Sequence, residues 1–159
     1  MKEIHLSNGA VSLVDDDDFD RVSKFKWHCT STGYAARTIY TPPKEEGEPA
    51  KFTTQKMARF IMGNPEGLDV DHRSMNRLDN RKENLRVATR SQNSCNRGAP
   101  RSNTSGHKGV SWNKQKGKWN AQIRLDGKIY GLGRFATKTE AAEAYINAAS
   151  RLHGEFARV

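Results

Sequence analysis

One stretch of the chain, residues 69–97, most limits what the sequence can fold into. It reads DVDHRSMNRLDNRKENLRVATRSQNSCNR and gathers Asp, His and Asn among many arginines. Packing of a hydrophobic core gives no reason for such a composition. Hydrolysis of a phosphodiester does, because that reaction needs a base, a metal ion held by oxygen ligands, and cations that face the phosphates.

The apolar and capping residues of this stretch predict a strand, a loop, a second strand and a helix. Residues 70–72 are typical of the end of a strand, and residues 85–88 of its antiparallel partner. Thr89 and Gln92 have the spacing of a capping box, which predicts a helix that begins at Arg90. The pattern therefore predicts an Asp-His pair at a strand end, opposite an asparagine of the helix.

The residue types within this frame predict a hydrolytic site. The Asp71 carboxylate and the Asn93 amide oxygen are hard ligands that suit Mg²⁺ or Mn²⁺, and two protein ligands leave positions for water and phosphate. His72 titrates near neutral pH and is the expected general base. Asn84 is expected to hydrogen-bond the loop or the imidazole. Each residue alone favours an ordinary surface role, and their combination favours catalysis.

The net charge of +9 is unevenly spread. Residues 101–159 carry eleven Lys and Arg against four Asp and Glu, whereas residues 1–67 carry nine against ten. A basic C-terminal third with interleaved aromatic residues predicts a nucleic-acid partner rather than a merely solvated surface.

Neither the cysteines nor the apolar segments indicate export. Cys29 and Cys95 lie far apart and have no zinc-ligand spacing, so we expect neither a disulfide framework nor a zinc site. The N-terminus lacks the apolar core of a signal peptide, and no apolar run approaches the ~20 residues of a membrane span. The expected location is the cytoplasm.

The residues before the motif predict a small β/α region. The pattern indicates a hairpin over 4–14, a helix over 15–25, a hairpin over 26–40, a strand over 51–53 and a helix over 54–62. The acidic run at the start of the first helix favours helix capping over a metal site, because consecutive side chains do not converge on one point.

After the motif, a polar, Pro-bearing segment over 98–106 predicts a linker between a nuclease domain over 1–97 and a DNA-binding domain over 107–159. The second domain is expected to pack a three-stranded antiparallel sheet on one helix, which makes the whole chain α+β. Its predicted elements are strands over 109–112, 118–125 and 128–132 and a helix over 138–152, with a capping box at Thr137 and Glu140 and a C-cap at Gly154.

Alternation in the middle strand predicts one apolar and one polar face. Trp119, Ala121, Ile123 and Leu125 are expected to pack on the helix, whose apolar residues fall on one side. The polar face is a candidate for the DNA major groove. The candidate DNA-binding residues are Lys108, Lys116, Lys118, Asn120, Gln122, Arg124, Lys128 and, in the first domain, Arg97.

The stretch over 69–97 resembles the HNH nuclease motif of the ββα-metal type. The spacing of Asp71-His72, Asn84 and Asn93 carries the resemblance, which implies a base at His72, metal ligands at Asp71 and Asn93, and an orienting role for Asn84. The third motif position, often His in this family, is Asn here and still supplies an oxygen ligand. Residues 57–59 read MAR where family members commonly carry Met-His-Arg.

The C-terminal third resembles the AP2/ERF DNA-binding domain over about 50 residues. The resemblance implies a sheet in the DNA major groove. Ser111 and Asn113 stand where plant members usually carry arginines, and Gly131 stands where they carry a DNA-contacting Trp, so the sequence preference of the plant members does not transfer. The matching positions are Gly109-Val110, Gly117-Lys118-Trp119, Ile123-Arg124, Leu132-Gly133, Phe135 and Glu140-Ala141-Ala142.

Together these features predict a metal-dependent DNA endonuclease similar to the homing endonucleases of phages and bacteria, acting on double-stranded DNA as a monomer or homodimer. The alternative is a DNA-binding transcriptional regulator whose nuclease unit is inactive. RNA binding is a third hypothesis, but the sequence lacks the paired aromatic platform expected for it.

Overall fold

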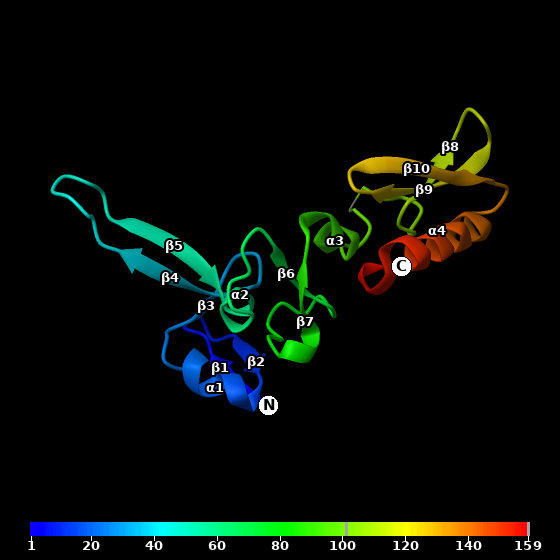
Figure 1. Cartoon of the computed structure of the whole chain (residues 1–159). Coiled ribbons are helices and arrows are strands. Elements are labelled where there is room, and N and C mark those ends of the chain that lie inside the picture. The colour runs from blue at the N-terminus through cyan, green and yellow to red at the C-terminus, as the bar shows by residue number, and fades with distance from the viewer. Residues whose placement is uncertain (101, 159) are drawn as a thin grey trace. The chain divides into compact units, whose positions relative to one another are not determined.

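A computed structural model describes residues 1–100 and 102–158 (Figure 1). The protein is α+β, and its described strands form small antiparallel sheets of two or three strands. The chain divides into two compact units, Met1–Ala88 and Thr89–Val159, called unit 1 and unit 2 below. None of the helices in the described ranges is long and apolar enough to cross a membrane.

Unit 1 contains three sheets and two short helices around one core. Three strands form the order β3-β4-β5, and β1-β2 and β6-β7 are hairpins. Val14, Val22, Trp27 and Met57 are almost completely buried in the core. The elements are β1 (Lys2–His5), β2 (Val11–Val14), α1 (Asp16–Val22), β3 (His28–Cys29), β4 (Ala35–Thr41), β5 (Lys51–Lys56), α2 (Met57–Ile61), β6 (Asp69–His72), η1 (Lys82–Asn84) and β7 (Leu85–Ala88).

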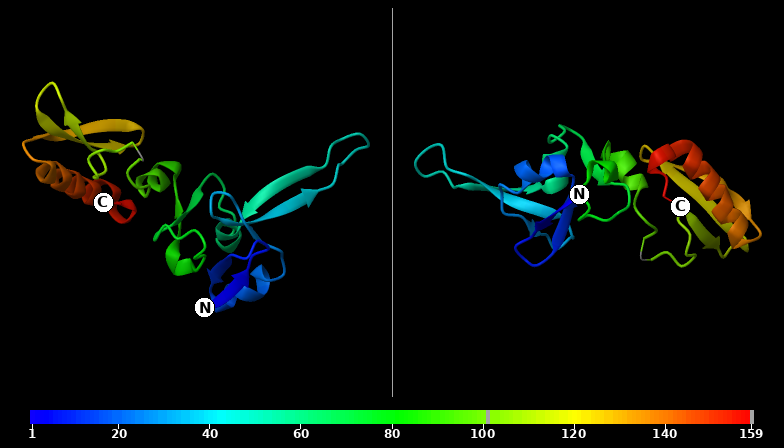
Figure 2. Two further views of the ribbon diagram at one scale, coloured as in Figure 1. Left: turned by 180° about the vertical axis from the view of Figure 1, so that it is seen from behind. Right: turned by 90° about the horizontal axis from the view of Figure 1, so that it is seen from below.

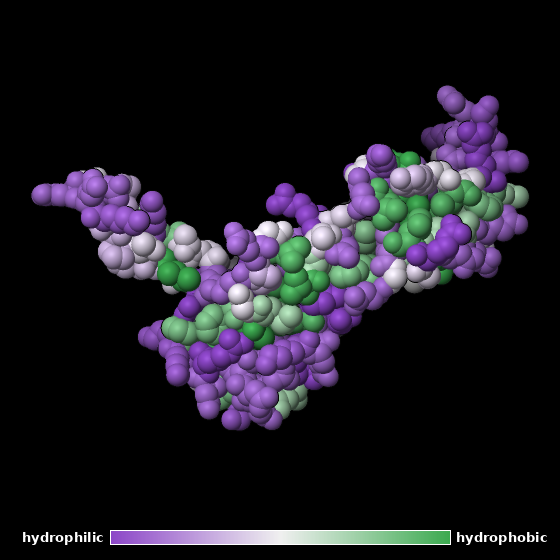
Figure 3. All heavy atoms as spheres, viewed as in Figure 1, coloured by the Kyte–Doolittle hydropathy of each residue, from purple (hydrophilic) through white to green (hydrophobic). Residues whose placement is uncertain are grey.

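The β4–β5 hairpin is longer than the sequence pattern predicts. Thr54, Gln55 and Lys56 were assigned to a helix over 54–62, and this part of the prediction is wrong. They extend β5, paired in register with residues 36–38 of β4, and α2 begins only at Met57. The ladder hydrogen bonds of a neighbouring strand outweigh a helical apolar pattern, which depends on local spacing alone. Figure 3 shows that the tip of this hairpin is hydrophilic.

The acidic run lies in the first turn of α1, as predicted, but Asp15 does not cap the helix with its side chain. The Asp15 carboxylate instead accepts a hydrogen bond of 2.7 Å from the backbone N–H of Lys82. Asp18 is buried, and its carboxylate pairs with Arg21 at 2.7 Å and with Lys82 at 3.0 Å. The run therefore holds the segment that precedes β7, which is the second strand of the predicted motif.

Unit 2 begins with α3 and continues with an antiparallel sheet in the order β10-β9-β8. Figure 2 shows α4 lying along one face of this sheet. The predicted linker over 98–106 falls inside this unit, and the predicted domain boundaries at 97 and 107 stay a prediction. The elements are α3 (Arg90–Cys95), β8 (Val110–Asn113), β9 (Lys118–Leu125), β10 (Lys128–Phe135), α4 (Lys138–His153) and η2 (Gly154–Phe156).

The core of unit 2 joins the predicted apolar face of β9 to α4. Ala121 and Ile123 are buried against Tyr145 and the alanines of α4, which confirms the alternation argument. Both predicted capping boxes are present, with reciprocal hydrogen bonds at Thr89 and Thr137. Leu152, an apolar residue of the last turn of α4, is 37% exposed, because the buried alanines of the helix end at Ala149.

Gly109 allows α4 to approach the sheet closely. Its φ of +72° is in the left-handed region, and a β-carbon there would collide with the Tyr145 ring and the Gln122 carbonyl oxygen. We expect Gly109→Ala to lower the free energy of unfolding by about 2–4 kcal/mol, since backbone strain and overpacking add.

Denaturant unfolding would measure this loss, and Gly117→Ala is the matched control. Gly117 has a φ of +59° but no atom within 4 Å of an added β-carbon, so it isolates the backbone cost. Equal losses in the two variants would show that the close contact with Tyr145 contributes nothing.

Candidate active site and DNA-binding surface

The β6–β7 hairpin positions the predicted Asp-His pair at its centre. The register places Asp71 opposite Arg86 and His72 opposite Leu85. Asp71 is 6% exposed and His72 is 4% exposed, so both side chains are withdrawn from bulk water. Because consecutive strand residues point to opposite faces, the two side chains have different surroundings although they are neighbours in sequence.

The Asp71 carboxylate forms a buried ion pair with Arg86. The Asp71 Oδ2 atom accepts hydrogen bonds from the Arg86 Nε at 2.9 Å and from the Arg86 Nη2 at 2.7 Å. A buried charge needs such a partner, since an unpaired ion in the interior costs several kcal/mol. Local spacing alone does not pair these residues, although their positions on opposite strands follow from the predicted hairpin.

The His72 imidazole is held by a chain of buried hydrogen bonds. Its Nε2 atom lies 3.2 Å from the Asn80 Oδ1, and the Asn80 Nδ2 donates to the Ser12 Oγ at 2.8 Å. The Ser12 hydroxyl donates to the backbone carbonyl of Leu78 at 2.8 Å, so it accepts from Asn80. This direction makes the Asn80 oxygen an acceptor, which assigns the proton of a neutral imidazole to Nε2 and its lone pair to Nδ1.

Burial lowers the pKa of His72 below its ordinary value. The hydrogen bond with Asn80 and the negative charges of Asp71 and Asp79 act in the opposite direction but are smaller effects. A lowered pKa keeps the imidazole neutral at neutral pH, and a neutral imidazole can accept a proton.

Asn84 braces the loop between the two strands of the hairpin. Its Oδ1 accepts from the backbone N–H of Ser74 at 2.9 Å, and its Nδ2 donates to the Asp79 carbonyl at 2.8 Å. Of the two roles predicted for Asn84, these contacts correspond to the loop contact, whereas Asn80 bonds the imidazole. Asn80 was missed because its link to Ser12 joins residues 68 positions apart, which local spacing does not reveal.

Asn93 and Arg97 belong to unit 2. Asn93 is half-buried on α3, and Arg97 is exposed just after the helix. No group of three or more His, Cys, Asp or Glu that could hold a metal occurs in the described ranges. The donor chemistry still fits an ion such as Mg²⁺, which is bound by one or two protein oxygens and retains water and phosphate ligands.

The polar face of β9 carries four of the predicted DNA-binding residues. Lys118, Gln122 and Arg124 are exposed, and Asn120 is half-buried. Lys128 lies opposite Leu125 in the register, so it is on the helix side of the sheet although it is exposed.

The register adds Arg134, which sequence analysis missed, to the polar face. Arg134 lies directly opposite Asn120, because an irregularity between Gly131 and Gly133 shifts the alternation of β10 by one residue. Simple alternation would have placed Arg134 on the same side as Leu132, which packs against the core.

We expect Arg134→Gln to weaken binding to duplex DNA. A plot of the logarithm of the association constant against the logarithm of the salt concentration should become less steep by about 1, since one phosphate contact is lost. Titrations at several salt concentrations would measure the slope. The control is Arg151→Gln, which removes an exposed arginine from α4. A slope unchanged from wild type at Arg134 would exclude this residue from the interface.

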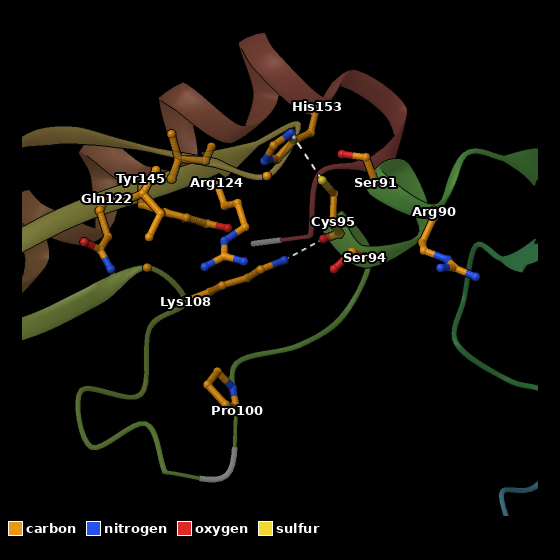
Figure 4. Close-up of a pocket in the computed structure, with 14 residues that line it drawn as sticks. Arg90, Ser91, Ser94, Cys95, Pro100, Lys108, Gln122, Arg124, Tyr145 and His153 are labelled. Carbon is orange, nitrogen blue, oxygen red and sulfur yellow. Dashed lines mark hydrogen bonds between the residues drawn. The ribbon is translucent and has the colours of Figure 1, made fainter. Parts of the chain in front are cut away.

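Lys108 has a structural contact that sequence analysis did not foresee. Its ammonium donates to the Cys95 backbone carbonyl, and the Cys95 sulfur lies 3.5 Å from the Nδ1 of His153 (Figure 4). Partial burial lowers the pKa of Lys108. These contacts join α3 to the sheet and α4, beside a cavity of about 680 Å³ that Arg90 and Arg124 also line.

Lys116, the remaining candidate of unit 2, is exposed in the β8–β9 turn.

A buried Asp-His pair on a β-hairpin, followed in the chain by a short helix, defines a nuclease of the ββα class. Residues 61–95 match the family described as HNH endonuclease, and residues 105–155 match the AP2 domain family. An uncharacterized HNH endonuclease of Acanthamoeba polyphaga mimivirus is 32% identical over 157 residues, which cover 94% of this chain and 74% of the relative. The chain belongs to the HNH endonuclease family and carries a DNA-binding AP2 domain.

A phage protein is also similar. Protein 3.8 of Escherichia phage T7 is 37% identical over 94 residues, which cover 59% of this chain and 77% of the relative.

Proposed function

We propose that this DNA endonuclease is metal-dependent, that His72 is its general base, and that it acts as a homing-type enzyme that cuts one strand per active site. The observation that carries the proposal is the His72 imidazole, which is buried, has a pKa lowered by burial, and is held in orientation by Asn80. A neutral, oriented imidazole is the group that base-catalysed hydrolysis needs.

In the proposed mechanism the Nδ1 atom of His72 takes the proton of the attacking water. The water oxygen forms a bond to phosphorus, and the bond to the leaving oxygen breaks as that oxygen takes the electron pair. Asn80 keeps the other ring nitrogen protonated, so Nδ1 carries the lone pair. The nearby negative charges of Asp71 and Asp79 favour the imidazolium that forms.

Asp71 and Asn93 are the proposed ligands of a divalent metal, either Mg²⁺ or Mn²⁺. When bound, such an ion polarises the phosphate and stabilises the departing oxygen. The proposal is supported by the hard oxygen chemistry of the two side chains and by the match to the HNH family. Arg86 holds the Asp71 carboxylate in a fixed position through its ion pair of 2.7 Å.

The AP2 unit is proposed to supply affinity and position for double-stranded DNA through the polar face of its sheet. Lys118, Gln122 and Arg124 are exposed there and suit contacts with phosphates and base edges. A monomer would then nick one strand, and a homodimer would cut both.

One observation favours the alternative of a DNA-binding regulator with an inactive nuclease unit. The Asp71 carboxylate is already engaged by Arg86 in a buried ion pair, and this pair competes with a metal ion for the oxygen. The alternative predicts DNA binding without cleavage.

A plasmid nicking assay with purified protein separates the two functions. We expect conversion of supercoiled plasmid to the nicked form with Mg²⁺ or Mn²⁺, and no conversion when EDTA removes the metal. If the protein binds DNA specifically but nicks it with neither Mg²⁺ nor Mn²⁺, its function is that of a DNA-binding regulator. Nicking in the presence of EDTA would exclude metal dependence.

A further inference from the structure

Tyr34 lies close to the candidate base and to two cations. Its ring centroid is 5.8 Å from that of His72, and the planes meet at 52°. The Lys56 Nζ lies 4.0 Å from the Tyr34 centroid, and the Arg77 Cζ lies 4.8 Å from it. Tyr34 precedes β4, Lys56 ends β5, and Arg77 lies in the loop after β6, so three separate segments of unit 1 converge here.

The two cations are held in place by the fold. An Arg77 Nη1 hydrogen donates to the backbone carbonyl of Thr32, which ties the loop after β6 to the turn before β4. Lys56 pairs with Ala36 in the β4–β5 ladder, so its backbone is fixed. A cation over an aromatic face gains about 0.5–1 kcal/mol at an exposed site, which orients these side chains but does not neutralise them.

Charges of both signs surround Lys56. Partial burial is the largest cause of its lowered pKa; the negative charge of Asp69 raises this pKa, and the positive charges of Arg77 and Arg59 lower it. Arg59 is occupied with the carbonyls of Leu68 and Pro65 at 2.6 Å each. Two neighbouring cations over one ring repel each other, and an anion between them would relieve that repulsion.

We propose that Lys56 and Arg77 bind a phosphodiester group of the substrate strand beside His72, and that Tyr34 positions both cations and the imidazole. This inference rests on the proposed function of His72. A phosphate suits the site because it accepts a planar guanidinium and a point-charge ammonium at once. The ring gives the base and the bound phosphate a common support, so the reacting phosphodiester is placed relative to Nδ1.

The test uses the full chain and duplex DNA in EDTA, where binding is measured without cleavage. The measured quantity is the slope of the logarithm of the association constant against the logarithm of the salt concentration. We expect Lys56→Gln and Arg77→Gln each to make this slope less steep by about 1, and the double variant to make it less steep by about 2. The matched control is Lys51→Gln, which removes an exposed lysine at the opposite end of β5. Thermal unfolding would verify that all variants are folded.

A second readout locates the contact. Ethylation of the DNA phosphates next to the nicking site should weaken binding by the wild-type protein. The same ethylation should not weaken binding by the double variant. Tyr34→Leu should give the same loss, whereas Tyr34→Phe keeps the ring and should retain binding.

The results distinguish this inference from the proposed function. If the wild type binds but never nicks DNA while the slopes fall as expected, the phosphate site stands and the nuclease mechanism fails. If the wild type nicks DNA but the slopes of both single variants equal those of wild type and Lys51→Gln, the phosphate site is wrong.

Discussion

Replacing His72 with alanine is expected to lower the rate of metal-dependent nicking by about 10²–10⁴-fold, the usual contribution of general base catalysis. The imidazole is buried and oriented by Asn80, and no other histidine is bonded to this chain of side chains among the described residues. Single-turnover nicking with saturating protein measures the chemical step directly. Binding to the same duplex in EDTA should change little, since DNA affinity is expected to come from cations.

The control for this variant is His5→Ala, which removes an exposed histidine from β1. Because His72 is buried, alanine also leaves a cavity, so His72→Gln should be measured beside it to preserve most of the volume. Nicking at the wild-type rate by either His72 variant would exclude His72 as the base. A variant that unfolds can be recognised by its circular dichroism and does not enter the comparison.

Replacing Asp71 with alanine is expected to lower the free energy of unfolding by about 3–5 kcal/mol, since it removes the carboxylate from a buried ion pair and leaves the buried guanidinium charge in place. Arg86 is only 6% exposed, so water cannot replace the lost carboxylate without local opening. The same change removes a proposed metal ligand and should abolish nicking. Denaturant unfolding and plasmid nicking measure the two losses independently.

The double variant Asp71→Ala with Arg86→Met separates stability from catalysis. Methionine removes the buried charge of Arg86 and fills part of the volume, so most of the lost stability should return, as happens when other buried ion pairs are replaced by apolar residues. Nicking should stay absent, because the carboxylate is missing. Recovery of nicking together with stability would show that Asp71 supports only the fold.

Local sequence spacing was sufficient for the parts of the fold that depend on neighbouring residues. The strands over 85–88 and 118–125 have the predicted bounds, and the capping boxes at Thr89 and Thr137 are present. The predicted helix over 54–62 failed in its first three residues, because these pair with β4. A strand partner about 18 residues away along the chain leaves no mark on local periodicity.

The DNA-binding candidates show the same division. Alternation correctly sorted the two faces of β9, since a single strand has a strict period of two. Arg134 could not be assigned, because the irregularity in β10 changes its face. Lys108 was selected for its charge, but the fold uses its ammonium to hold Cys95.

By itself, the sequence determined the α+β class, the Asp-His pair at a strand end, and the basic C-terminal unit, because each depends on residue type and short-range spacing. Only the tertiary structure decided that Asn80 orients His72, that Arg86 pairs with Asp71, and that Tyr34 lies beside the base. The physical reason is that buried polar groups must find partners wherever the folded chain brings them, and those partners come from segments that the sequence keeps apart.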